Sequence, residues 1–511
     1  MEASTTLWLL YILAASCVLY KVFVSSKNSP KTCSSNARAR RPPGPAPIPL
    51  LGNIFHLQGE EPHHALARLA GVYGPVMSLK LGTAAAIVAS SAAGARDVLQ
   101  KHDHLLAARS ITDAGRALGN HERSIIWLPC TSPLWKRLRA VCASHLFSAR
   151  GLDATRAVRE RKVRELVRCL GRVAHAGEAV DVGRVVFSGV LNLVSNVLFS
   201  EDVADVSSDR AQELETLIKG MVEEVTKPNL SDLFPVLSAL DLQGRRRRTA
   251  GRLRRFSDFF DRIIGRRMET GRGGRKDDFL DVLLQLHSED QLSLQTINSF
   301  LSDLFVSGAE TNSITVEWTM AELLRQPAVM SKVRAELREA LGSKQHPDES
   351  DIGSLPYLRA VVMETMRLHP ASPLLMPHEA MANGAEVGGF AVPKGTKVIV
   401  NLWAIMRDPA SWPRPDEFVP ERFLGAAATD VDFRSKDHRL GFMPFGAGRR
   451  ACPGTPMATR VVTLILASLL HAFEWRLPKG MQPSDVDVRD RFGTSLKMVT
   501  PLKAVPVPVF R

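Results

Sequence analysis

The chain has 511 residues, of which 45% are hydrophobic and 23% charged, a composition typical of a globular protein. Its 66 lysines and arginines against 53 acidic residues give a formal net charge of +13, which suits nucleic acid, anionic lipid or an acidic protein partner. Only 6% of residues are aromatic and no zinc-finger spacing occurs, so we expect no nucleic-acid partner. The six cysteines lack close pairs, which favours free thiols in a reducing compartment.

The N-terminus predicts a membrane anchor. Residues 7–24 are apolar apart from small polar residues and Lys21, and as a helix they would span roughly 27 Å. Basic residues follow this segment, which places the rest of the chain in the cytosol. A cleaved signal peptide would need a basic stretch before the apolar run, and none is present. We therefore expect residues 1–26 to form a single transmembrane helix of the endoplasmic reticulum, with membrane lipid as a partner.

Residues 27–53 are first basic and then rich in proline, which predicts a stiff hinge rather than a flexible glycine–serine linker. The body, residues 54–511, mixes short strand patterns with long amphipathic helical ones. We expect strands at 76–81 and 86–89, paired strands within 388–400, helices at 297–325 and 459–471, and short strands at the end. The run of arginines at 245–248 begins a basic helix, either as a solvated face or as a contact with anionic lipid. The predicted fold class is mainly α with small β-sheets.

A single cysteine, Cys452, has an unusual setting. Residues 445–454 read FGAGRRACPG, in which glycines allow tight turns and arginines can neutralise an anion. A thiolate that binds an iron needs this kind of rigid, positively charged environment. The same stretch matches a loose dinucleotide-binding fingerprint, but no strand, helix start and downstream acidic residue accompany it, so we reject that alternative.

The pattern Phe-x-x-Gly-x-Arg-x-Cys-x-Gly is complete at Phe445, Gly448, Arg450, Cys452 and Gly454. In this pattern the chain resembles the cytochrome P-450 haem-thiolate monooxygenases. The resemblance implies the cytochrome P-450 fold over residues 54–511, haem b as cofactor, and Cys452 as the iron ligand. It also implies electrons from NADPH through a partner, NADPH-cytochrome P-450 reductase. A thiolate ligand favours O–O cleavage, so one oxygen atom enters a C–H bond of the substrate.

The segment SGAET at 307–311 lies inside the predicted helix 297–325. Glycine in a helix interior costs about 1 kcal/mol relative to alanine, so Gly308 needs a reason, either helix packing or a local site for water and dioxygen. The family's oxygen-activating pattern, (Ala/Gly)-Gly-x-(Asp/Glu)-Thr, is matched by Gly308, Glu310 and Thr311. By resemblance, Glu310 and Thr311 help deliver protons. Ser307 departs from the pattern, and its hydroxyl could change local hydration or the orientation of the substrate.

Two further motifs place charged groups on helices. Glu364 and Arg367 lie three residues apart in an apolar stretch, so we expect a buried pair, and the resemblance adds Arg422 to give a structural triad that locks the cysteine loop. Trp135 and Arg139 share a helix face and could meet one anionic group. By resemblance these two, with Arg450 and His378, contact the haem propionates, and the adjacent Lys136 and Arg137 either dock an acidic electron donor or form a solvated face.

The substrate pocket is predicted from stretches that are largely apolar with a few hydroxyls, which suits a hydrophobic substrate of little charge. The pocket residues are Leu304, Phe305, Ser372, Leu374, Leu375, Thr494 and Ser495. The chain is most similar to plant microsomal enzymes of family seventy-six, whose members often hydroxylate monoterpenols or diterpenes. The resemblance thus implies a mono- or diterpenoid substrate, with a phenylpropanoid, flavonoid or alkaloid as the alternative. Retention of Glu310 and Thr311 argues against a haem-thiolate isomerase or dehydratase, and the complete cysteine motif argues against a non-catalytic membrane binding protein.

Overall fold

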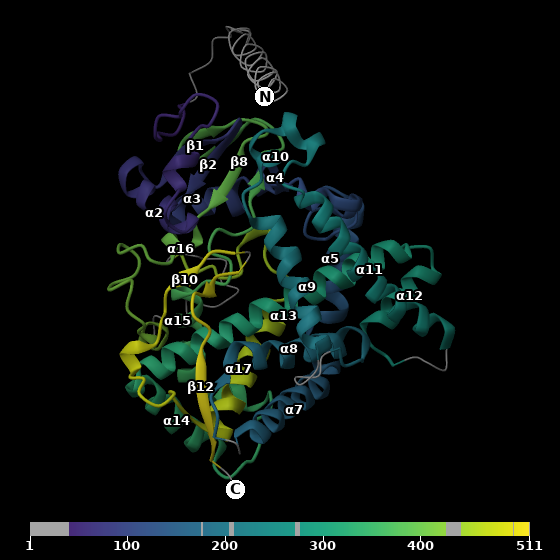
Figure 1. Ribbon diagram of the computed structural model, residues 1–511, viewed down its shortest axis with the longest axis vertical. Helices are drawn as coiled ribbons and strands as arrows, with labels where there is room; N and C mark the ends of the chain where they lie inside the picture. Colours follow the sequence, from purple (N-terminus) through teal and green to yellow (C-terminus); the bar gives the residue numbers. More distant parts are fainter. Residues whose placement is uncertain are drawn as a thin grey trace, which may run out of the picture. The chain divides into compact units, whose positions relative to one another are not determined.

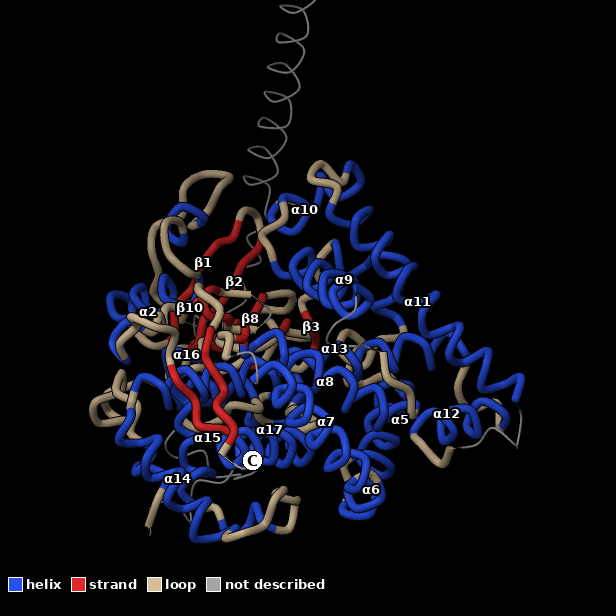
Figure 2. Tube along the Cα trace, turned by 60° about the horizontal axis from the view of Figure 1, so that its bottom comes forward, coloured by secondary structure: helices blue, strands red, loops and turns tan. Residues whose placement is uncertain are grey.

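A computed structural model describes residues 40–174, 177–203, 209–270, 276–425, 441–493 and 495–509. The predicted transmembrane anchor, the connection at 271–275 and Thr494 lie outside the described residues. From Arg41 onward the chain forms one unit, in which helices enclose small sheets that gather toward one side (Figures 1 and 2). The predicted class, mainly α with small β-sheets, is confirmed.

The helices differ widely in length, and the longest, α13, crosses the middle of the body (Figure 1). The α-helices are α2 (Pro62–Tyr73), α3 (Ala92–Arg96), α4 (Asp103–Leu106), α5 (Pro133–Val141), α6 (Ala149–Ala154), α7 (Arg156–Ala174), α8 (Val182–Phe199), α9 (Asp209–Thr226), α10 (Leu230–Leu233), α11 (Arg245–Thr270), α12 (Phe279–Ser288), α13 (Leu294–Arg325), α14 (Pro327–Leu341), α15 (Pro356–Leu368), α16 (Leu402–Ile405) and α17 (Thr455–Ala472).

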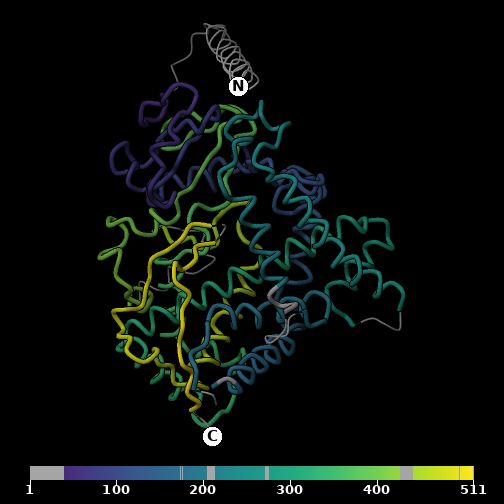
Figure 3. The backbone as a smooth tube through the Cα atoms, in the orientation of Figure 1, coloured from purple at the N-terminus to yellow at the C-terminus, as the bar shows by residue number. Residues whose placement is uncertain are grey.

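The strands are short and form four sheets, ordered β1-β2-β8-β5-β3, β4-β12-β9, β6-β7 and β10-β11. They are β1 (Val76–Leu81), β2 (Ala84–Ala89), β3 (Ala108–Arg109), β4 (Val180–Asp181), β5 (His378–Glu379), β6 (Ala385–Val387), β7 (Phe390–Val392), β8 (Lys397–Val400), β9 (Phe473–Arg476), β10 (Asp490–Arg491), β11 (Lys497–Met498) and β12 (Lys503–Pro508). The C-terminal segment reaches the middle of the body and returns along β12, drawn in yellow in Figure 3.

The five-stranded sheet joins distant parts of the sequence. β1 and β2 form the predicted antiparallel hairpin, and Gly82 (φ +62°) lies in its turn. β8 then lies parallel to β2, with Ala86 opposite Lys397. The prediction that the two strands within 388–400 pair with each other is wrong. β7 pairs with β6, whereas β8 pairs with β2 and β5. The turn at 393–395 redirects the chain from the small hairpin to the larger sheet, because the Gly395 amide donates to the Ala380 carbonyl at 2.8 Å.

The described part of the proline-rich segment packs against β1. The Ser78 amide donates to the Pro43 carbonyl at 2.7 Å, and the Ser78 hydroxyl donates to the Pro42 carbonyl at 2.9 Å. A Cβ atom on Gly44 would lie 2.0 Å from the Ser78 carbonyl oxygen, so only glycine allows this approach. The segment is thus attached to the body from Pro42 onward.

The core surrounds α13, whose Trp318 side chain is completely buried. Two of the helices packed around it, α8 and α17, are long and apolar enough to cross a membrane, but 72% and 67% of their apolar windows lie inside the body. Both are therefore core helices of the described unit. Their apolar composition is explained by burial on nearly every face.

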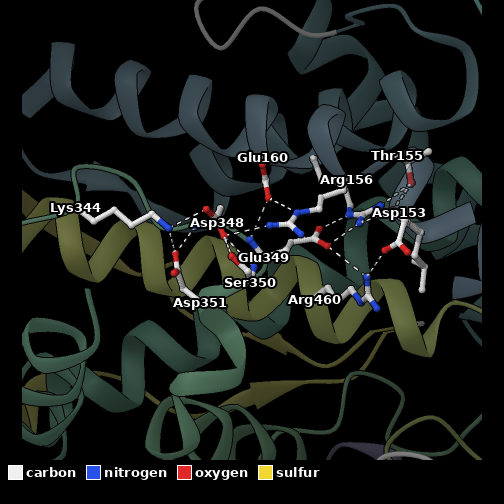
Figure 4. A network of polar contacts seen from close by, with 12 residues as sticks. Asp153, Thr155, Arg156, Glu160, Lys344, Asp348, Glu349, Ser350, Asp351 and Arg460 are labelled. Carbon is white, nitrogen blue, oxygen red and sulfur yellow. Dashed lines mark hydrogen bonds and ion pairs between the residues drawn. The ribbon is translucent and has the colours of Figure 1, made fainter. Parts of the chain in front are cut away.

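A charge network joins α7 to α17 (Figure 4). The guanidinium of Arg159, fully buried on α7, donates to the Glu349 carboxylate at 2.7 Å and to the Leu152 carbonyl at 2.8 Å. Arg460 of α17 reaches the same carboxylate at 3.5 Å. Since α17 begins directly after Cys452-Pro453-Gly454, this network holds the helix that positions the cysteine loop.

Candidate active site

A cavity of about 500 Å³ opens beside α13, between this helix and the cysteine loop. Its walls come mainly from α5, α8, α9, α11, α13 and the start of α17. Most of the predicted site residues line it: Trp135, Arg139, Gly308, Glu310, Thr311, His378, Phe445, Arg450, Cys452 and Gly454. The structure therefore brings together motifs that are more than 300 positions apart in the sequence.

The cysteine loop is shaped by its glycines. Gly446 and Gly448 both have a φ of +67°, and a Cβ atom on Gly448 would lie 1.7 Å from the Leu99 carbonyl oxygen, so no other residue fits there. Gly448 contacts the neighbouring backbone and does not line the cavity, whereas Gly454 does. The Cys452 amide donates to the Phe445 carbonyl at 2.9 Å, which closes the loop and leaves the thiol open to the cavity.

The surroundings of the Cys452 thiol disfavour its ionisation in the absence of a metal. Burial deep in the protein raises its pKa, and this effect is opposed by the amides of Gly454 and Thr455 and by the positive charge of Arg139. A thiol with a raised pKa stays protonated at neutral pH until a cation binds and displaces the proton.

Three partly buried guanidiniums face the cavity with backbone carbonyls as their hydrogen-bond partners. Arg109 donates to the Met376 carbonyl at 2.5 Å, Arg139 to the Ala451 carbonyl at 3.0 Å and Arg450 to the Ala107 carbonyl at 2.9 Å. Burial lowers the pKa of Arg109 to about 9 and that of Arg450 to about 10.

Among the described residues, none of these three cations forms an ion pair with a carboxylate, and the buried Nε of Arg109 has no hydrogen-bond partner. Cations with this little access to solvent are stabilised by a counter-anion. The cavity is therefore built to hold an anionic group. Arg109 was not predicted as a contact of this anion, because no spacing motif distinguishes it from the other two arginines of residues 105–129, Arg116 and Arg123.

Trp135 and His378 were predicted to contact the haem propionates, but the N–H group of each donates to a backbone carbonyl instead. The Trp135 indole N–H donates to the Ile125 carbonyl at 3.1 Å, while Arg139 and Arg450 lie over its ring at 5.6 and 4.9 Å. Trp135 thus orients the two cations by cation–π contact. Burial and the charge of Arg109 lower the pKa of His378 to about 3, and its Nδ1 donates to the Leu106 carbonyl at 2.7 Å. Only the imidazolium form of His378 could donate its second N–H to an anion.

The helix α13 runs unbroken through the SGAET segment. A Cβ atom on Gly308 would lie 3.2 Å from Val194 Cγ2, so the glycine allows α8 to pack closely here, and it also lines the cavity. The Thr311 hydroxyl donates to the Ser307 carbonyl at 2.9 Å. Both interpretations of Gly308, helix packing and a place in the site, are compatible with this geometry.

Glu310 has an ion-pair partner that could not be predicted from the sequence. Its carboxylate lies 2.5 Å from the Lys497 ammonium of β11, and the Ser495 hydroxyl is 3.4 Å away. The Glu310 side chain is 6% exposed and that of Lys497 34% exposed. The pair thus connects the cavity with the surface. No local pattern around residue 497 indicates this contact, because it depends on how the C-terminal segment returns to α13.

The substrate-pocket predictions are only partly matched. Leu304, Ser372, Leu375 and Ser495 line the cavity. Phe305 does not; its ring is buried among Phe199, Phe256, Phe259 and Phe260, because the next position on a helix points about 100° away. Leu374 also does not line the cavity and packs beneath the sheet with a separate cluster that includes Leu66, Leu69 and Met77.

An acidic residue on α13 was missed. Asp303 lines the cavity, and its carboxylate accepts a hydrogen bond from the Ser124 hydroxyl at 2.7 Å. Burial raises the pKa of Asp303 to about 7. This contact fixes the loop before α5 to α13 and thereby shapes one wall of the cavity.

The predicted triad forms and is buried. Glu364 and Arg367 are each 0% exposed, and the guanidinium donates twice to the carboxylate, at 2.7 and 2.9 Å. Arg422 and the Val419 amide donate to the same carboxylate at 3.1 and 2.8 Å. Arg367 also donates to the carbonyls of Met406, Pro415 and Glu417. The triad does not line the cavity, which agrees with a structural role.

Comparison with known proteins decides the family. The cytochrome P450 family model matches residues 42–501. This chain belongs to the cytochrome P450 family. It is 51% identical over 504 residues to cytochrome P450 76M5 of Oryza sativa subsp. japonica, covering 98% of this chain and 99% of that protein. It is 52% identical over 473 residues to oryzalexin E synthase of the same species, covering 91% of each, and 43% identical over 471 residues to geraniol 8-hydroxylase of Swertia mussotii, covering 92% and 94%.

The cavity of this P450 fits haem b, the cofactor of the family. Cys452 would ligate the iron, and Arg109, Arg139 and Arg450 would hold the two propionates, which supply the anion that these cations lack. The chain is a cytochrome P450 monooxygenase that receives electrons originating from NADPH through a reductase and acts on a hydrophobic substrate.

Proposed function

We propose that this P450 hydroxylates a mono- or diterpenoid. The observation that carries the proposal is a cavity with a cysteine thiol on one wall and apolar side chains over most of the rest, including Leu193, Val197, Leu253 and Leu304. Such a wall suits a hydrocarbon skeleton with few polar groups. The names of the relatives point the same way, since they include geraniol 8-hydroxylase and ent-cassadiene C11-alpha-hydroxylase 1.

In this proposal the haem supplies dioxygen activation, and the protein positions the reactants. The three guanidiniums fix the propionates, and Trp135 fixes two of the guanidiniums. Thr311 and Glu310 line the cavity next to Gly308, where their side chains would relay protons from solvent toward the cofactor. Lys497 pairs with Glu310 and, because its own side chain is 34% exposed, links this carboxylate to solvent. The apolar walls exclude water from the reacting C–H bond.

The cellular setting is proposed from the sequence. Residues 1–26 would anchor the protein as a single-pass helix in the endoplasmic reticulum, with the catalytic body in the cytosol. NADPH-cytochrome P-450 reductase would be the electron donor there. The exposed side chains of Lys136 and Arg137 on α5 suit an acidic docking surface on that reductase.

A spin-state titration tests the substrate class. Microsomes that hold the full-length protein are titrated with monoterpenols, diterpene hydrocarbons, flavonoids and fatty acids, because a ligand that displaces water from the iron shifts the haem spectrum. The proposal predicts a high-spin shift with terpenoids. A shift that occurs only with phenolic compounds would contradict the terpenoid assignment and leave the haem chemistry intact.

A further inference from the structure

Ser307 presents a hydroxyl to the cavity from the middle of α13. The residue lines the cavity and is exposed to it, although its neighbours Phe305 and Ala309 are completely buried. Its carbonyl accepts a hydrogen bond from Thr311 at 2.9 Å, but its own hydroxyl bonds to none of the described residues. Ser307 also stands where the family pattern has alanine or glycine.

The other hydroxyls of α13 that line the cavity behave differently. Ser302 donates to the Asn298 carbonyl at 2.9 Å, Thr311 to the Ser307 carbonyl at 2.9 Å, and Thr315 to the Thr311 carbonyl at 2.9 Å. Each satisfies its hydroxyl proton one helical turn back, as serine and threonine in helices commonly do. Ser307 does not make the equivalent bond, so both its donor and its lone pairs remain available to a ligand.

The charged groups of the same wall are already occupied. The Asp303 carboxylate accepts from Ser124, and the Glu310 carboxylate is paired with Lys497. Of the polar side chains at 303, 307 and 310, only the Ser307 hydroxyl is thus uncommitted. It lies one turn before Thr311 and on the same helix face, which places it next to the oxygen-activating segment.

We propose that the Ser307 hydroxyl binds an oxygen atom of the substrate, and that the substrate is therefore an already oxygenated terpenoid, an alcohol or a carbonyl compound. This inference rests on the proposed function and narrows its substrate class. A pure hydrocarbon would displace the water that solvates Ser307 and leave the hydroxyl unpaired in an apolar cavity, which is unfavourable. A substrate oxygen replaces that water. A preceding reaction must then introduce this oxygen, and the present enzyme adds a second one.

The test compares ligand pairs that differ only in one hydroxyl. The probes are geraniol with 2,6-dimethylocta-2,6-diene, and abietadienol with abietadiene. Spin-state titrations on the full-length haem-loaded enzyme give a Kd for each probe, and the measured quantity is the ratio of hydrocarbon to alcohol Kd. We expect a ratio of about 10 in the wild type for at least one pair, as one net hydrogen bond predicts.

Two variants distinguish a specific role of the Ser307 hydroxyl from the effect of removing any serine hydroxyl from this cavity wall. Ser307→Ala introduces the residue usual in the family, removes no intramolecular hydrogen bond, and should bring the ratio close to 1. Ser302→Ala is the matched control on the same helix and cavity wall, where the hydroxyl is already bonded to Asn298, and should keep the wild-type ratio. Carbon monoxide difference spectra confirm that all three proteins hold the same amount of haem.

Two results would overturn the inference alone: terpenoids bind the wild type without preference for the alcohol, or Ser302→Ala removes the preference as fully as Ser307→Ala does. If no terpenoid shifts the wild-type spectrum and a phenolic compound does, the proposed function fails as well. The two failures are therefore distinguishable.

Discussion

Replacing Glu364 by alanine should strongly destabilise the protein, because this carboxylate is the only acidic partner of the buried Arg367 among the described residues. Glu364 is 0% exposed and accepts four hydrogen bonds, two from Arg367, one from Arg422 and one from the Val419 amide. The variant would leave the Arg367 guanidinium buried with only carbonyl partners and the Val419 amide without its acceptor.

The magnitude follows from the burial of the pair. Breaking a buried ion pair by removing one partner costs about 3–5 kcal/mol. With an unfolding entropy of about 2.1 cal/mol/K per residue, a body that extends from Arg41 to Arg511 loses roughly 1 °C of Tm per kcal/mol. Glu364→Ala should therefore lower Tm by about 3–5 °C and reduce the yield of haem-loaded enzyme, since the triad fixes the segment that leads to the cysteine loop.

Thermal unfolding at one fixed scan rate, with the carbon monoxide difference spectrum as a measure of haem loading, checks this prediction. Glu417→Ala is the matched control: it removes a carboxylate that pairs with Arg414 at 2.8 Å, but the two side chains are 56% and 63% exposed. An exposed pair contributes at most about 1 kcal/mol. Equal shifts in the two variants would refute the reasoning that burial makes the triad important.

Three further predictions concern the cavity. Arg109→Leu should accelerate haem transfer to apomyoglobin about tenfold or more, as loss of a hydrogen bond to a charged group predicts, and an unchanged rate would remove Arg109 from the propionate site. Thr311→Ala should lower the ratio of product formed to NADPH consumed, and unchanged coupling would contradict the proton-delivery role. Burial raises the pKa of Asp303 to about 7, above its value near 3.9 in the unfolded chain. Between about pH 4 and 7 the folded protein therefore holds a proton on Asp303 that the unfolded chain has lost. The contribution of Asp303 to the free energy of unfolding thus falls as the pH rises through this range. The wild-type Tm should thus decline more steeply from pH 5 to 8 than that of Asp303→Asn, and parallel curves would contradict the raised pKa.

The parts of the site whose residues lie close together in the chain were predictable from the sequence. The Cys452 loop is determined by its local backbone geometry, and Glu364 meets Arg367 because the two lie one helical turn apart. Arg109 of β3 lines the cavity, and Lys497 of β11 pairs with Glu310 on the cavity wall. No local sequence pattern indicates where those two strands lie. Phe305 shows a third limit: an apolar residue on a helix that is buried all round gives no signal of which face meets the cavity.

The fold shows the same division. The helix expected at 297–325 is α13, Leu294–Arg325, and the strand expected at 76–81 is β1. Hydrophobic periodicity and turn residues are sufficient for such elements. The parallel pairing of β2 with β8 joins segments about 300 residues apart, and it was not predicted because pairing depends on the packing of everything between them.

The central claim is that this P450 inserts one oxygen atom from dioxygen into a terpenoid. The most direct measurement is an incubation of the full-length enzyme with reductase, NADPH, ¹⁸O₂ and a panel of terpenoids and phenolic compounds, followed by mass spectrometry of the products. The account predicts an NADPH-dependent terpenoid product that carries one ¹⁸O atom and is lost in Cys452→Ala. Labelled products from phenolic compounds alone, or a terpenoid product without label, would contradict it.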